Sequence, residues 1–280
     1  MNSGGVRGSL FFAKSPPATG ETVDGQVRYT EAFTVQPFGN TLVVKTCTGQ
    51  QIYDVLNQQY NNPEPGANRI MPTDEYADFL YAAVLRDWGA ERERMQRYAD
   101  RFDAAEQVRI VGEGTDLTLS IAGRSMKVDA GGANIPGGEF FCSPVEDSAE
   151  GEITFAEFPA VLTGRDVVGV HLRFENGKVV DASADVNEDF LIQTLDTDEG
   201  ARFLGELGIG CNPGITKHTR NILFDEKIDG TVHLALGNGI HDIGGTNVSA
   251  IHWDIVKDLR PGGRIELDGE LVQENGRWLI

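Results

Sequence analysis

The heptapeptide TVHLALG at residues 231–237 and the octapeptide SAIHWDIV at residues 249–256 decide the fold of this chain. In both stretches apolar residues alternate with smaller or polar ones, and a period of two residues is typical of a β-strand. This period puts His252 and Asp254 on one face of the second strand and three apolar residues on the other. In the first strand it puts His233 and the small Ala235 opposite three apolar residues. We therefore predict two half-buried strands that carry imidazole and carboxylate groups on one face.

Neither pattern identifies a metal site by itself. An H-x-D pair also occurs by chance on surface strands, and a single histidine in an apolar strand is usually a core or edge residue. The chain has only five histidines, and two of them stand in similarly patterned strands. That coincidence favours a shared role for His233 and His252 without excluding a purely structural one.

Candidate carboxylates flank these strands. Glu139 follows the turn-forming NIPGG at residues 134–138, which would expose it at the start of a strand. Glu206 stands among apolar residues and glycines, within a helix that we expect at residues 198–207. It is either a buried carboxylate that must be paired or ligated, or an exposed residue at the helix end. Two Glu, two His and one Asp would suit a two-metal hydrolytic centre, in which carboxylates bridge ions about 3.5–4 Å apart.

The rest of the chain indicates an α+β fold that is rich in strands. A helix is expected to start at Thr73, as its N-cap, and to continue to Phe102 with an interruption at Gly89. Hairpins are expected at residues 176–177 and 275–276, because Asn-Gly between apolar alternations is a strong hairpin signal. The three cysteines are widely spaced, which excludes a disulfide framework and a four-cysteine zinc site.

The charge of the chain divides it into two parts. The net charge of −19 disfavours binding to nucleic acid, because the field repels phosphates. Residues 1–71 hold five basic and five acidic residues, so the entire excess lies in residues 72–280. No apolar run approaches the roughly 20 residues of a membrane helix, and the N-terminus lacks a signal-peptide pattern. We expect a cytoplasmic protein in which two segments of different origin meet near Met71.

The second segment resembles the aminopeptidase T and aminopeptidase S family of metallopeptidases. The resemblance runs from residue 72 to residue 280, and its motifs are GTDL at 114–117, NIPGGE at 134–139, SPVEDSAEG at 143–151, LGE at 204–206, FDEKI at 224–228, GTVHLALG at 230–237 and IHWD at 251–254. It implies a strand-rich metallopeptidase domain that removes N-terminal residues from peptides and works as a homodimer.

The same resemblance implies the site residues. Two divalent ions (zinc, cobalt or manganese) would be held by Glu139, Glu206, His233, His252 and Asp254. Glu226 would activate water or support the ligands from outside, although it could instead pair with Lys227 or Arg220. The family has a tyrosine shortly after its first histidine ligand, where this chain has Ile240. Losing a transition-state hydrogen bond costs about 3 kcal/mol, so we expect activity to be reduced about a hundredfold.

Residues 1–71 resemble a different family, the C-terminal, substrate-binding domain of 5′-nucleotidases. The matching motifs are NSGGVR at 2–7, QPFGNT at 36–41, TGQQI at 48–52 and NPEPGANRI at 62–70. The resemblance implies a partial α/β fragment in which Asn2 and Arg7 would bind substrate and Phe38 would stack on a base. The phosphatase domain is missing, so we expect this function to be lost.

Two alternatives to a peptidase stay open. His233, His252 and Asp254 could form a two-His-one-carboxylate triad for a single iron ion, as in ring-cleaving dihydroxypyridine dioxygenases, which resemble the same family. The chain could also be an inactive chimera, whose partial domains leave apolar surface exposed.

Overall fold

The computed structural model describes residues 74–280, with side chains from residue 78 onward. The chain divides into two compact units, Met1–Ala77 and Asp78–Ile280. The nucleotidase-like site residues Asn2, Arg7 and Phe38, and the expected N-cap Thr73, lie outside the described residues. Within residues 74–280, no helix is long and apolar enough to cross a bilayer.

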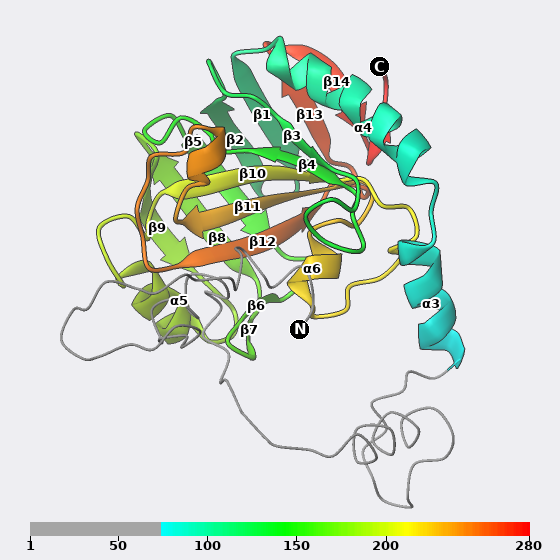
Figure 1. The fold of residues 1–280 in the computed structure, drawn as a ribbon. Coiled ribbons are helices and arrows are strands. Elements are labelled where there is room, and N and C mark those ends of the chain that lie inside the picture. The colour runs from blue at the N-terminus through cyan, green and yellow to red at the C-terminus, as the bar shows by residue number, and fades with distance from the viewer. Residues whose placement is uncertain (1–73) are drawn as a thin grey trace, which may run out of the picture. The chain divides into compact units, whose positions relative to one another are not determined.

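Two helices open the described part of the chain (Figure 1): α3, Asp74–Val84, and α4, Trp88–Asp103. The expected interruption is present, but it lies at residues 85–87 and not at Gly89, which is inside α4. Asp87 caps the second helix, and its carboxylate accepts hydrogen bonds from the backbone N–H groups of Gly89 and Ala90. Such a cap satisfies N–H groups that have no partner inside the helix, so the new helix begins at Trp88.

An antiparallel sheet of eight strands forms one layer, in the order β15-β14-β13-β1-β2-β5-β8-β9. Its strands are β1 Gln107–Gly112, β2 Thr115–Ser120, β5 Glu150–Phe155, β8 Val170–Glu175, β9 Lys178–Ser183, β13 Arg264–Leu267, β14 Glu270–Glu274 and β15 Arg277–Trp278. Both expected Asn-Gly hairpins are confirmed. Positive φ at Asn176 and Gly177 (49° and 77°) and at Asn275 and Gly276 (51° and 70°) is the backbone that tight hairpins need.

A second antiparallel sheet has the order β12-β11-β10-β4-β3. Its strands are β3 Lys127–Asp129, β4 Glu139–Cys142, β10 Leu204–Gly210, β11 Thr231–Gly237 and β12 His252–Asp258. The expected strands at 231–237 and 249–256 are thereby confirmed. A short hairpin and three short helical segments complete the unit. The hairpin consists of β6, Ala160–Leu162, and β7, Arg165–Val167; the helical segments are α5, Glu188–Leu195, α6, Ile222–Asp225, and the 3₁₀ turn η2, His241–Ile243.

The helix expected at residues 198–207 is wrong, because Leu204–Gly210 is strand β10 and the nearby helix, α5, ends at Leu195. Glycine at 205, 208 and 210 explains the difference. Each glycine costs about 1 kcal/mol in a helix interior, whereas a strand here needs residues without side chains, as the site below shows. Glu206 is consequently a buried residue in the middle of a strand and not a residue at a helix end.

One apolar core joins the two sheets. Its buried side chains come from the eight-stranded sheet (Leu117, Leu172) and from the five-stranded sheet (Leu207, Leu234, Trp253). Helix α4 adds Phe102, whose ring meets that of Phe140 edge-on at 5.2 Å. The expected apolar faces of β11 and β12 are therefore the faces that hold the sheets together, which leaves the opposite face of the five-stranded sheet for the polar residues.

Candidate metal centre

The register of the five-stranded sheet gathers the candidate residues on its one polar face. Residues directly opposite each other on neighbouring strands share a face. Glu206 stands opposite Ala235 and Ala235 opposite Asp254, while Gly237 stands opposite His252. On the other side of β10, Gly210 stands opposite Glu139. With His233 two residues from Ala235, all five candidates lie on the same face.

A β-bulge in β10 sets the orientation of Glu206. Leu204 pairs with Leu236 and Glu206 with Ala235, so Gly205 is an extra residue in this strand. Because side chains alternate along a strand, the extra residue lets Leu204 point into the core while Glu206 points to the polar face. A regular strand would place both on one side.

Small residues leave room for the polar tips. Gly208 stands opposite His233, and a Cβ added there would lie 1.9 Å from its Nε2. Even alanine would therefore displace the imidazole. Ala235 sits in the same way between Glu206 and Asp254. The tip of the His233 ring lies over the glycine, and its Nε2 faces carboxylates on β10 and β4.

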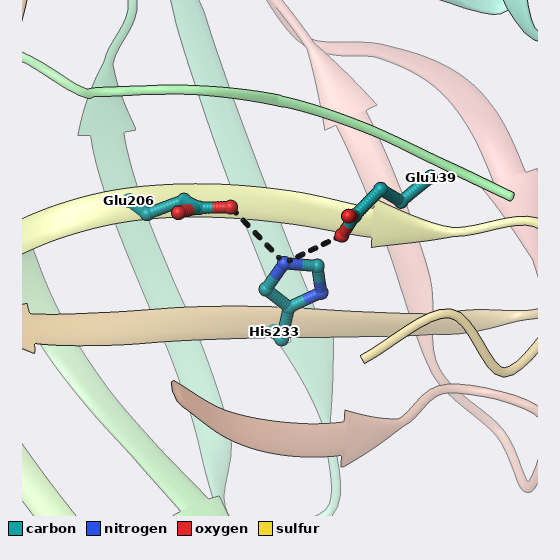
Figure 2. Close-up of side chains that lie close together, drawn as sticks. All are labelled: Glu139, Glu206 and His233. Atoms are coloured by element: carbon teal, nitrogen blue, oxygen red, sulfur yellow. Dashed lines mark hydrogen bonds and ion pairs between the residues drawn. The ribbon is translucent and has the colours of Figure 1, made fainter. Parts of the chain in front are cut away.

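Three of the five side chains meet at Nε2 of His233 (Figure 2). This nitrogen lies 3.3 Å from Oε1 of Glu206 and 3.4 Å from Oε2 of Glu139. All three side chains are buried, and that of His233 is fully so. One ligand atom from each residue lies within 4.8 Å of the others, which is close enough to hold one cation.

A second group forms on the other oxygen of Glu206. Nε2 of His252 lies 3.3 Å from Oε2 of Glu206 and 3.7 Å from Oδ1 of Asp254. The orientation of the ring is set behind it, because Nδ1 donates a hydrogen bond of 2.8 Å to the carbonyl oxygen of Asn238. At 35% side-chain exposure, His252 marks the solvent side of the cluster.

The electrostatics of the cluster are those of a buried ion pair. Burial acts to raise the pKa of Glu206, but its hydrogen-bonded imidazoles outweigh burial and lower this pKa to about 2. Burial acts to lower the pKa of His233 and of His252, but the surrounding carboxylates raise these pKa values to about 9 and about 10. Burial and the nearby carboxylates together raise the pKa of Glu139 to about 7. Without metal, both imidazoles therefore carry positive charge at pH 7.

Glu226 and Lys227 complete the polar interior. Glu226 ends α6 and pairs with the ammonium of Lys227, one of the two alternatives considered for it, while Arg220 pairs with Asp166 instead. Nζ of Lys227 also lies 3.0 Å from Oε1 of Glu139. Lys227 is fully buried, and its two carboxylates raise its pKa against the effect of burial. Sequence reasoning missed its role, although a lysine between Glu226 and Ile228 in an apolar stretch is a signal for a buried partner.

The comparisons with known proteins follow the same part of the chain. The family model described as thermophilic metalloprotease (M29) matches residues 67–278. The chain belongs to the M29 peptidase family. This M29 chain is 31% identical over 198 residues to aminopeptidase AmpS of Bacillus subtilis, covering 59% of the chain and 47% of that protein. It is 32% identical over 197 residues to aminopeptidase T of Thermus aquaticus, covering 60% and 48%.

Solved structures agree on the fold of the M29 chain. It superposes on wild-type AmpT from Thermus thermophilus with a TM-score of 0.66 and 26% identity, covering 78% of this chain and 61% of that one. It also superposes on a 2,5-dihydroxypyridine dioxygenase from Pseudomonas putida with a TM-score of 0.61, covering 71% and 62%. At 18% identity the second likeness concerns the fold alone.

The start of the chain matches a different family. The chain spans about half the length of the curated relatives quoted above. A model of the 5′-nucleotidase C-terminal domain matches residues 1–85. Both resemblances inferred from the motifs are thus confirmed.

The donor set fits divalent metal. Oε2 of Glu139 is buried and has no hydrogen-bond partner among the described residues, and such an atom normally has one. It faces Nε2 of His233, the nitrogen that Oε1 of Glu206 also faces. Carboxylate oxygens and imidazole nitrogens converging in this way are ligands for zinc, cobalt or manganese. Neither buried cysteine of the described residues, Cys142 or Cys211, belongs to the cluster.

Proposed function

We propose that this chain is a metal-dependent aminopeptidase with a dinuclear centre held by Glu139, Glu206, His233, His252 and Asp254. One observation carries the proposal: the two oxygens of Glu206 face two different imidazoles. Glu206 therefore belongs to both ligand groups, Glu139–Glu206–His233 and Glu206–His252–Asp254. A carboxylate in that position is suited to bridge two ions.

Divalent ions bound by these residues would supply Lewis acidity toward a peptide carbonyl and toward water. The side chains then divide the remaining work. Glu226 is the proposed base, because it is a buried carboxylate whose pKa is raised by burial, and it therefore accepts a proton more readily. Lys227 holds Glu226 and Glu139 in place by pairing with both. The exposed edge at His252 is the side from which a peptide would enter.

The mononuclear iron alternative is less well supported by the grouping of the ligand atoms. Among residues 74–280, the two groups whose ligand atoms lie within 4.8 Å of one another each contain one histidine and Glu206. Neither group combines His233, His252 and Asp254, the triad that a single iron ion would need. The two-carboxylate environment of His233 also matches a hydrolytic centre better than a facial triad.

Peptides are the proposed substrates, because the relatives are described as aminopeptidases. Since the chain spans about half of those relatives, whether it turns over peptides is the first point to test. An inactive chimera would retain the cluster and fail to hydrolyse.

Metal analysis and turnover together test the proposal. We expect about two divalent ions per chain by mass spectrometry and chelator-sensitive release of leucine from leucyl p-nitroanilide. Glu206→Gln should lower the metal content to one ion or less. Glu152→Gln is the matched control, because Glu152 faces His171 at 3.8 Å on the surface, and it should keep both ions. One ion together with iron-dependent oxygen uptake on a dihydroxylated aromatic would favour the dioxygenase. Two ions without turnover would indicate the inactive chimera.

A further inference from the structure

A pocket of about 270 Å³ opens beside the cluster and shares Asp254 with it. Its walls come from β6, from the strand β12 that carries Asp254, and from the loop before α6. β6 packs against β12, and α6 lies near the same end of the sheet (Figure 1). Apolar side chains, among them Val161, Ile222 and Val256, form half of the lining, and the other half is polar. The polar half includes a histidine paired with a buried carboxylate.

This pair is His218 with Asp225. Nε2 of His218 lies 3.2 Å from Oδ2 of Asp225, whose side chain is 2% exposed. Oδ1 of Asp225 accepts hydrogen bonds from the backbone N–H of Thr219 at 2.6 Å and from its hydroxyl at 2.8 Å. The ring of His218 also stacks on Phe158, with centroids 4.9 Å apart. His218 and Asp225 both line the pocket, and none of our motif arguments assigned either residue a role.

The contacts determine which nitrogen of His218 carries the proton. Two donors from Thr219 point at Oδ1 of Asp225, which suits an ionised carboxylate. Such a group only accepts hydrogen bonds, so Nε2 of His218 carries the hydrogen and Nδ1 carries the lone pair. Burial lowers the pKa of His218 despite Asp225, so the ring is neutral at pH 7. Among residues 74–280, no side chain or backbone group forms a hydrogen bond with Nδ1.

The pocket therefore offers a hydrogen-bond acceptor next to a candidate metal ligand. The guanidinium of Arg220 also lines the pocket, but it is paired with Asp166 at 2.6 Å and not with Nδ1 of His218. A complementary ligand group is one that is small and donates hydrogen bonds. The free amino group of a peptide, as an ammonium with three donors, has these properties.

We propose that His218 is a substrate-binding residue whose Nδ1 accepts a hydrogen bond from the protonated N-terminal amine of the peptide. This inference rests on the proposed aminopeptidase function and adds to it the group that recognises the free N-terminus. Asp225 is a positioning residue, because it holds His218 in the tautomer that presents a lone pair. Phe158 fixes the plane of the His218 ring by stacking on it.

Two substitutions separate this role from mere packing. His218→Phe keeps an aromatic ring to stack on Phe158 and removes both nitrogens. His218→Asn loses the ring but retains an oxygen acceptor near the position of Nδ1. A packing role predicts that Phe is tolerated and Asn is harmful, whereas the proposed role predicts the opposite order.

The assay measures recognition of the amine directly. Isothermal titration compares L-leucinamide with its des-amino analogue, 4-methylpentanamide, on the metal-loaded full chain. A hydrogen bond to a charged group corresponds to roughly a tenfold or greater preference for the amine. We expect His218→Phe to lose that preference while it retains the wild-type metal content, and His218→Asn to keep it within about threefold. KM for leucyl p-nitroanilide should rise about tenfold in the Phe variant, with a smaller change in kcat.

Any other order of the two variants overturns the proposal. Should His218→Phe fail to fold, His218→Leu replaces it, because leucine has nearly the size of asparagine and no acceptor. A wild-type chain that hydrolyses leucyl substrates while both variants retain the amine preference refutes the role of His218 alone. A wild-type chain without hydrolysis refutes the aminopeptidase proposal, and the role of His218 falls with it.

Discussion

Replacing Glu206 by Gln should remove the central charge of the cluster and destabilise the metal-free protein. The reason lies in the pKa of Glu206, which falls from an ordinary 4.5 to about 2 because His233 and His252 pair with its two oxygens. That fall corresponds to about 3 kcal/mol in favour of the ionised group. Breaking a buried pair by removing one partner costs a similar amount, about 3–5 kcal/mol.

The loss should depend on pH in a defined way. The folded-state pKa of Glu206 is lowered, so its contribution is complete above about pH 4.5 and disappears as the pH falls through about 2. The pKa values of His233 and His252 are raised, so their contribution is complete below about pH 6.5 and disappears as the pH rises through about 9 and about 10. The effect of Glu206→Gln should therefore be largest between about pH 4.5 and pH 6.5.

Urea denaturation followed by tryptophan fluorescence provides the measurement. All three tryptophans of the chain, at 88, 253 and 278, lie in the described unit, so their emission reports on its unfolding. With chelator present, we expect Glu206→Gln to lower the free energy of unfolding by about 3 kcal/mol at pH 6 and by clearly less at pH 10. Glu152→Gln, which alters an exposed Glu–His pair, should cost under about 0.5 kcal/mol. A loss below about 1 kcal/mol at pH 6, or an equal loss at both pH values, would refute the reasoning.

Three further predictions concern the same interior. Metal binding should release protons, because His233 and His252 are protonated at pH 7 and must lose a proton to bind metal. Titration calorimetry in buffers of different ionisation enthalpy should detect this release, and metal affinity should rise from pH 6 to pH 9. Lys227→Met should destabilise the fold by about 3–5 kcal/mol in urea, since it strands two buried carboxylates. Gly208→Ala should lower the number of bound ions and cost about 1–3 kcal/mol, because its Cβ would meet His233, whereas Gly112→Ala, with ordinary contacts, should keep both ions.

Local patterns predicted the parts of the fold that depend on neighbouring residues. The hairpins at Asn176 and Asn275 were identified correctly, because the turn geometry is a property of the Asn-Gly pair itself. The alternation around His252 and Asp254 likewise indicated which residues share a face. Glu139 was placed correctly at the start of a strand, because the turn-forming residues 134–138 come directly before it.

The features that local patterns did not predict depend on residues far apart in the sequence. Gly208 reads locally as a helix stop, and its real role appears only when His233, 25 positions later, lies over it. The bulge at Gly205 exists because β10 must match the register of β11. Lys227 has partners at positions 139 and 226, and the distant one cannot be read from its own surroundings. Pairing register and burial are set by the whole sheet, so a single stretch of sequence does not encode them.

The small residues beneath the cluster have an evolutionary consequence. The inner face of the five-stranded sheet holds the two layers together, while the outer face carries reactive groups above a floor of Gly208 and Ala235. Substituting polar side chains on that outer face leaves the packing of the inner face intact, so the ligand set can change without a change of fold. The 2,5-dihydroxypyridine dioxygenase from Pseudomonas putida shares this fold at 18% identity.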